Sequence, residues 1–226
     1  MGDVQRRLIA FDLDGTLIDS RRDLADAAND LIVELGGSPI PEEAIGRMVG
    51  EGAALLVRRA LAAAAVVEPP GAVARFLEIY DTRLLNHTRP YEGIPEAVRR
   101  AREYGRVVVL TNKPQHASER ILHGLDLHDL FDAVVGGDGP YPKKPDASAL
   151  LALTAETGAT PAMSLMVGDS AIDYETALRA GTFCCLAAYG YGFLNFPQDR
   201  LTGREWIARS PAELPGIFAR FASACD

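Results

Sequence analysis

The feature that most constrains the fold of this chain is a set of five short segments that are apolar on both faces. Such strands are typical of a parallel sheet covered by helices. Helical patterns separate the last four segments, and Gly158 and Gly181 each follow such a pattern at its C-terminal end. The segments are RLIAF (7–11), RVVVL (106–110), FDAVVGG (131–137), SLMVG (164–168) and TFCCLAA (182–188). They predict an α/β fold, a Rossmann-like parallel sheet core with helices on both faces.

The regular alternation is interrupted between the first and second strands. A strand–helix–strand unit needs only about 30 residues, but these two strands are followed by polar groups 99 positions apart (111 − 12). The sequence between them contains amphipathic helical patterns and no convincing strand. We therefore predict an inserted α-helical cap domain at residues 17–91 and a core formed by residues 1–16 and 92–226. The stretch LIDS (17–20) is expected to be one of two hinge strands.

The composition limits the partners of the chain. Its 226 residues carry a net charge of −8, which disfavours nucleic acid and membrane surfaces as partners. No apolar segment is long enough to span a membrane, and Asp12 interrupts the apolar run that begins at Leu8, unlike a signal peptide. Three cysteines without metal or redox spacing indicate reduced thiols. We expect a cytoplasmic protein, either a monomer or a homodimer.

Polar side chains follow three of the predicted strands at their carboxyl ends, the edge at which open α/β sheets bind ligands. They are Asp12 and Asp14 after the first strand, Thr111 and Asn112 after the second, Asp169, Ser170 and Asp173 after the fourth, with Lys143 and Lys144 in the loop after the third. Each group alone is also typical of a helix cap. Their convergence on one edge of one sheet predicts a functional site.

The residue types in this group indicate phosphoryl transfer. Several aspartates close together need a hard cation, and ligand sets made only of oxygen favour Mg²⁺. A lysine nearby meets a phosphate as a point charge, and the start of a helix supplies donors to phosphate oxygens. One carboxylate can attack phosphorus, and a second can transfer the proton.

Four stretches of the sequence resemble the four motifs of the haloacid dehalogenase-like hydrolase superfamily, in the right order. They are DLDGTLIDS, TNK, KKPDA and GDSAIDYETALRAG. The helical insertion resembles the C1 cap of that superfamily. Two further stretches, RMVGEGAALLVRRAL and YGYGF…SPAELP, are similar to its phosphoglycolate phosphatase branch. The resemblance covers nearly the whole chain.

The resemblance implies roles for the residues of the first and fourth motifs. Asp12 corresponds to the nucleophile, which is also a metal ligand. Asp14 corresponds to the general acid and base, and its backbone carbonyl would bind Mg²⁺. Asp169 corresponds to a further metal ligand. Gly15 permits the tight turn that brings the backbone close to the metal.

The same resemblance implies phosphate-binding and supporting roles. Thr111 and Asn112 would hold the transferred phosphoryl group. Lys144 would neutralise charge on the nucleophile and the phosphate. Asp173, with Ser170 beside it, would support the metal shell through water or through Lys144.

The insertion offers three candidates for substrate recognition. Gly50 and Gly52 open a predicted helix whose free amides could face an anionic substrate. Arg47 could pair with a substrate carboxylate, although a solvated arginine beside a simple turn explains the same pattern equally well. We interpret Lys143 as a solvated loop charge.

These residues favour a Mg²⁺-dependent phosphomonoesterase that acts on a small phosphorylated metabolite such as 2-phosphoglycolate, through an aspartyl-phosphate. The presence of Asp14 disfavours the related dehalogenases. Residues 17–91 contain no lysine, which argues against phosphonoacetaldehyde hydrolases and β-phosphoglucomutases. A pyrophosphatase or another sugar-phosphate phosphatase remains open. A non-catalytic phosphate-binding regulatory protein is disfavoured because Asp12, Asp14, Lys144 and Asp169 are all present.

Overall fold

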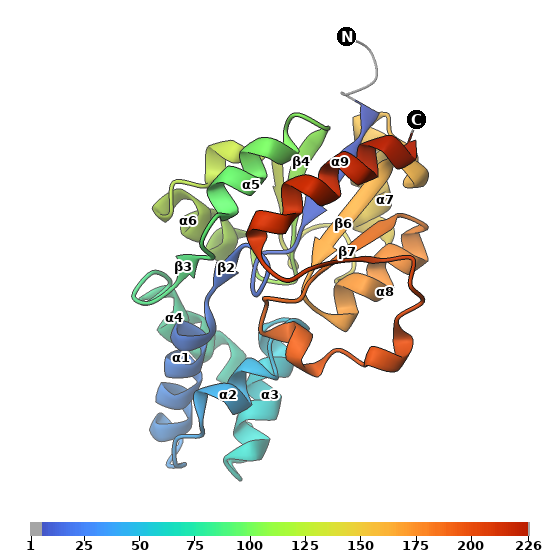
Figure 1. Cartoon of the computed structure of the whole chain (residues 1–226). Coiled ribbons are helices and arrows are strands. Elements are labelled where there is room, and N and C mark those ends of the chain that lie inside the picture. Colours follow the sequence, from blue (N-terminus) through green and yellow to red (C-terminus); the bar gives the residue numbers. More distant parts are fainter. Residues whose placement is uncertain (1–5, 226) are drawn as a thin grey trace.

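A six-stranded parallel sheet forms the core of the protein, as seen in a computed structural model that describes residues 6–225 (Figure 1). The strand order is β5-β4-β1-β6-β7-β8, so the chain leaves β1 to one side and returns to pair β6 on its other side. The strands are β1 (Leu8–Phe11), β4 (Arg106–Leu110), β5 (Ala133–Val135), β6 (Ser164–Gly168), β7 (Phe183–Ala187) and β8 (Trp206–Ala208). The predicted α/β core is therefore confirmed.

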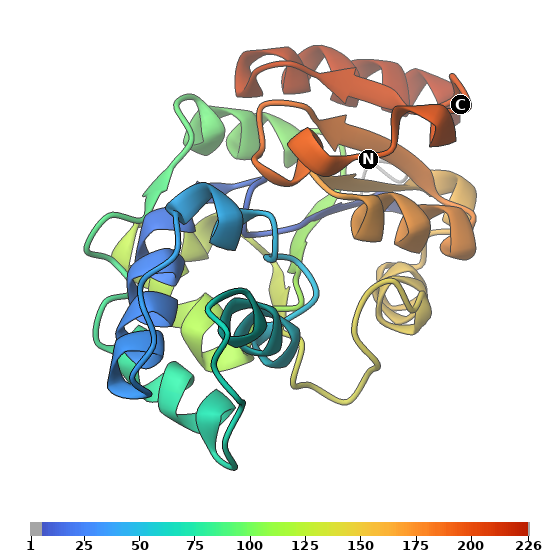
Figure 2. The same cartoon turned by 90° about the horizontal axis from the view of Figure 1, so that it is seen from below.

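Helices cover both faces of the sheet (Figure 2). Alternate residues of a strand point to opposite faces. Ile9 and Phe11 of β1 accordingly belong to one apolar cluster, and Leu8 and Ala10 to another. The first cluster is closed by α5 (Ile94–Ala101), α6 (Gln115–Gly124) and α9 (Leu214–Cys225), the second by α7 (Ser148–Thr157) and α8 (Ala171–Ala180). Both faces are thus sealed from water, as the double-sided apolar strands require.

The helical insertion leaves and rejoins the core through two short paired strands. β2 (Ile18–Asp19) pairs antiparallel with β3 (Arg89–Pro90). Figure 1 shows the helices between them gathered at the end of the sheet toward which β1 leads. They are α1 (Arg21–Glu34), α2 (Glu42–Gly46), α3 (Ala53–Ala63) and α4 (Ala72–Asp81). In residues 6–225, no helix combines the length and apolar character needed to cross a membrane.

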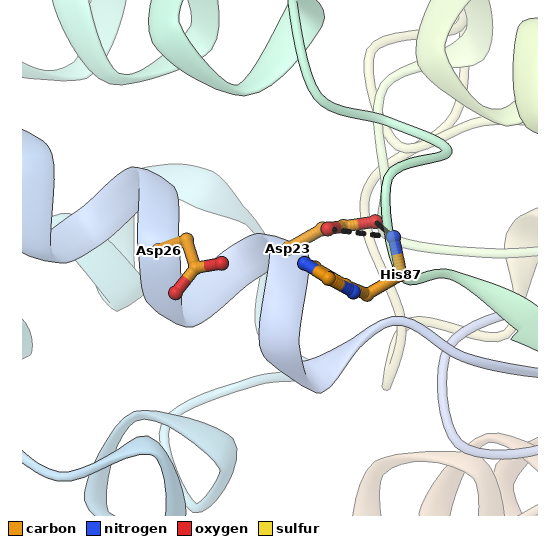
Figure 3. A group of neighbouring side chains, drawn as sticks. All are labelled: Asp23, Asp26 and His87. Carbon is orange, nitrogen blue, oxygen red and sulfur yellow. Dashed lines mark hydrogen bonds between the residues drawn. The ribbon is translucent and has the colours of Figure 1, made fainter.

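A buried carboxylate fastens the two connections to each other. Asp23, in the first turn of α1, accepts hydrogen bonds from the backbone N–H of His87 at 2.9 and 3.0 Å (Figure 3). It also accepts from the Thr88 N–H at 2.8 Å and from the Thr88 hydroxyl at 2.7 Å. A carboxylate oxygen of Asp26 lies within 4.8 Å of a carboxylate oxygen of Asp23 and of a ring nitrogen of His87. Because the Asp23 oxygens already have these donors, we interpret the group as a structural link at the hinge and not as a metal site.

Candidate active site

Three strand ends meet at one crevice because β1 lies between β4 and β6. Phe11, the last residue of β1, is in register with Val109 and Val167 on its two neighbours. The residues that follow these strands, among them Asp12, therefore emerge side by side. The Asp12 N–H continues the ladder by donating to the Val167 carbonyl at 2.9 Å, so the backbone at Asp12 is fixed by the sheet itself.

Asp12 is paired with a buried lysine. The Lys144 Nζ lies 2.9 Å from Asp12 Oδ1 and 2.6 Å from Asp173 Oδ1, and all three residues are buried. Burial raises the pKa of Asp12 to about 7, against the lowering effect of the Lys144 ammonium. Burial alone would lower the pKa of Lys144, but Asp12 and Asp173 raise it to about 12. The ammonium thus remains charged beside the carboxylate expected to act as nucleophile.

The Asn112 side chain holds two loops, a role that the sequence reasoning missed. Its Oδ1 accepts from the Lys144 N–H at 2.8 Å, and its Nδ2 donates to the Lys144 carbonyl at 2.9 Å. The same Nδ2 donates to the carbonyl of Gly50 in the insertion, also at 2.9 Å. One carboxamide therefore fixes the backbone that carries Lys144 and fastens the insertion to the core.

Asp14 has different partners from Asp12. The Lys113 Nζ lies 3.0 and 3.1 Å from its two carboxylate oxygens, and the Ser20 hydroxyl donates to Oδ1 at 2.5 Å. Lys113 also donates to the Tyr80 hydroxyl of α4 at 2.7 Å. The sequence reasoning gave Lys113 no role, although its place directly after Asn112 and the presence of only three lysines in the chain were available signals.

Three buried carboxylates at this site have one ammonium among them. Oxygen atoms of Asp12, Asp169 and Asp173 lie within 4.8 Å of one another. Burial raises the pKa of Asp169 well above its ordinary value, and the charges of Asp173 and Asp12 raise it further. Buried charge of one sign is costly unless an opposite charge meets it. An all-oxygen donor set with excess negative charge fits a hard cation such as Mg²⁺.

The three carboxylates differ in their capacity to bind that cation. Asp173 already accepts from Lys144 and, through Oδ2, from the N–H and hydroxyl of Ser170. Ser170 and Asp173 form a capping box at the start of α8. Asp173 therefore contacts Lys144 directly, and its support of a metal shell stays a prediction. Asp12 and Asp169 are the carboxylates best suited to contact the ion.

Glycines make room for Asp169. A Cβ on Gly15, whose φ is +86°, would lie 1.9 Å from Asp169 Oδ2, so no other residue fits without displacing that carboxylate. Gly190 and Gly192, in the stretch YGYGF (189–193) that follows β7, also surround it. The Gly192 N–H donates to Asp169 Oδ2 at 2.7 Å. A Cβ on Gly190 would approach both the Gly15 carbonyl and Asp169. The sequence reasoning did not assign this loop to the site.

Of the three candidates for substrate recognition in the insertion, two line the pocket beside Asp12 and one does not. Gly50 and Gly52 line the same pocket as Asp12 and Thr111, with Gly52 at the N-terminus of α3. Arg47, in contrast, is exposed and does not line this pocket. Lys143 is exposed as predicted.

Comparison with known proteins shows the family to which the chain belongs. Residues 6–181 match the family of hydrolases described as haloacid dehalogenase-like hydrolase. The chain therefore belongs to that family, and the resemblance of its four motifs is confirmed. It is an enzyme of the hydrolase class.

Several similar relatives within this family carry one name, phosphoglycolate phosphatase. The phosphoglycolate phosphatase of Pseudomonas putida is 40% identical over 215 residues, covering 91% of this chain and 75% of the relative. That of Caulobacter vibrioides is 34% identical and covers 99% and 95%. A crystal structure of a predicted phosphoglycolate phosphatase from Haemophilus somnus superposes with a TM-score of 0.85 at 29% identity, covering 94% and 98%. The chain is a hydrolase of this phosphatase type.

Proposed function

We propose that the protein is a Mg²⁺-dependent phosphomonoesterase that hydrolyses a small phosphorylated metabolite through an aspartyl-phosphate on Asp12. The observation that carries the proposal is the separation of partners at one strand end. Asp12 contacts Lys144, whereas Asp14 contacts Lys113 and Ser20. Two carboxylates with separate environments can take separate roles, one as nucleophile and the other as proton carrier.

In the first half of the proposed reaction, a carboxylate oxygen of Asp12 attacks the phosphorus of the ester. The bond between phosphorus and the ester oxygen breaks, and that oxygen takes a proton from the Asp14 carboxyl. The Lys144 ammonium beside Asp12 offsets negative charge as the phosphoryl group approaches. The Thr111 hydroxyl, just after β4, would donate to a phosphoryl oxygen.

In the second half, a water molecule attacks the phosphorus of the aspartyl-phosphate and gives its proton to Asp14. The bond between phosphorus and Asp12 breaks, which releases phosphate, restores the Asp12 carboxylate and leaves Asp14 again as the protonated carboxyl. Asp12, Asp169 and the Asp14 carbonyl would hold Mg²⁺, which supplies positive charge to the phosphoryl oxygens when bound. Asp173 keeps the Lys144 ammonium directed at Asp12 throughout.

Residues 17–91 would act as a cap over this site. Two contacts across the crevice support that role: Asn112 with Gly50, and Lys113 with Tyr80. A cap that closes over the substrate excludes water, which strengthens the electrostatic interactions inside. We place the enzyme in the cytoplasm on the ground of its free cysteines.

2-Phosphoglycolate is the leading substrate, supported by the names of the relatives at 34–40% identity. Hydrolysis of p-nitrophenyl phosphate with and without Mg²⁺ tests the reaction class, and no turnover with any divalent metal would refute it. A panel of phosphate esters, with pyrophosphate and sugar phosphates included, then ranks the substrates by kcat/KM.

A further inference from the structure

The pocket above Asp12 and Asp14 has one cationic side chain in its lining, that of Lys113, among the residues that the structure describes. The insertion contributes mainly apolar wall to it, through Leu24, Val49, Leu56, Phe76 and Leu77. Among these lining residues, a charged group on the leaving part of a substrate can meet the Lys113 ammonium.

Lys113 is held in place from both sides of the crevice. Its side chain is nearly fully buried, and Asp14 fixes it from the core. From the insertion, the Tyr80 hydroxyl contacts the Nζ at 2.7 Å, and the ammonium also lies 4.6 Å from the centre of the Tyr80 ring. Tyr80 is itself buried and stacked on Phe76, with ring centres 5.9 Å apart. The ammonium thus has a defined position at the boundary between core and insertion.

This position lies next to the ester oxygen of a bound substrate. In the proposed function, on which this inference rests, Asp14 must reach that oxygen to transfer a proton. The Lys113 Nζ is 3.0 Å from the Asp14 carboxylate. A carboxylate carried on the carbon beside the ester oxygen would therefore come within reach of the ammonium. The N-terminal end of α3, at Gly52 and Ala53, lines the same pocket and adds the positive end of a helix dipole.

We propose that Lys113, positioned by Tyr80, is the specificity-determining residue of this enzyme and binds a carboxylate on the leaving group. The substrate carboxylate replaces one of the two contacts that Asp14 makes with the ammonium. The Asp14 oxygen released in this way faces the ester oxygen. Lys113 therefore has the role first considered for Arg47, which lies outside the pocket.

The test compares two esters that differ in the carboxylate, 2-phosphoglycolate and ethyl phosphate. Values of kcat/KM are measured for both, with the wild-type enzyme and with Lys113→Gln. Loss of a desolvated charge pair is worth about 30-fold or more in affinity. We expect the preference for 2-phosphoglycolate over ethyl phosphate to fall by about that factor in the variant. Lys113→Arg, which keeps the charge, should retain most of the preference, and Arg47→Gln serves as the control at an exposed cation outside the pocket.

If Lys113 only stabilises the fold or positions Asp14, Lys113→Gln lowers kcat/KM for both esters by the same factor. The preference for 2-phosphoglycolate is then unchanged, and this result would overturn the proposal. The wild-type enzyme gives a second measurement that does not depend on the folding of any variant, because equal kcat/KM for the two esters would also overturn it. An enzyme that hydrolyses p-nitrophenyl phosphate without preferring the carboxylate ester refutes this assignment alone. An enzyme inactive on every ester refutes the proposed function as well.

Discussion

Replacement of Lys144 by methionine tests the charge balance of the site most directly. The variant keeps an apolar stem of similar length but removes the ammonium that contacts Asp12 at 2.9 Å and Asp173 at 2.6 Å. The three side chains have relative exposures of 2%, 9% and 1%, so water can replace little of the lost interaction. Removal of one partner from a buried ion pair costs about 3–5 kcal/mol.

For a chain of this size, 1 kcal/mol corresponds to about 2–4 °C in Tm. We therefore expect Lys144→Met to unfold roughly 6–20 °C below the wild type at pH 8 without added metal. Part of the loss should disappear at pH 5, because burial raises the pKa of Asp12 to about 7 and this carboxylate can take up a proton there instead of remaining an unpaired buried anion. Phosphatase activity should also be lost, since the nucleophile is no longer neutralised.

Thermal unfolding followed by circular dichroism at pH 5 and pH 8 measures both effects. Lys143→Met is the matched control, since Lys143 is the adjacent residue and is exposed. Its Tm should remain within about 2 °C of the wild type, as is usual for surface positions. If the two variants unfold at the same temperature, Lys144 does not stabilise the buried carboxylates and the account of the site is wrong.

Three further predictions address the nucleophile, the cation and the hinge. Asp12→Asn should abolish turnover of p-nitrophenyl phosphate while the protein still folds; a variant with most of its activity would disprove the nucleophile assignment. The raised pKa of Asp12 contributes stability that is present below its ordinary value of 3.8 and lost as the pH rises through about 7. Added Mg²⁺ should therefore raise Tm more at pH 8 than at pH 5, and an equal rise at both pH values would argue against binding at these carboxylates. Asp23→Ala leaves the buried N–H and hydroxyl of Thr88 and the N–H of His87 without their acceptor, so urea unfolding should show a loss of about 3 kcal/mol. Asp26→Ala, on the same helix, should cost under about 1 kcal/mol, and equal losses would contradict the proposed hinge link.

Part of the fold followed from local patterns in the sequence. Strands that are apolar on both faces can be buried only between two layers of helices, so the architecture could be predicted before the register was known. The length of the interruption after the first strand likewise predicted an insertion. The short α2, only five residues long and preceded by a proline, gave no periodic signal strong enough to predict it.

The core of the candidate site was determined by the sequence alone because its residues directly follow strands. Asp12, Thr111 and Asp169 each directly follow the last residue of a strand. Because these three strands are neighbours in the sheet, pairing of the strands brings the three residues together. Their chemistry could thus be inferred from residue type and spacing.

Only the tertiary structure decided how the insertion meets the core. Lys113 and Tyr80 are 33 residues apart, and Asn112 and Gly50 are 62 apart. Whether such pairs touch depends on the angle at which α1–α4 cross the crevice, which no local pattern encodes. The same angle leaves Arg47 in solvent. The sequence by itself determined which candidate groups converge at the strand ends because strand pairing positions them, whereas the packing of remote helices decided which residues line the pocket beside them.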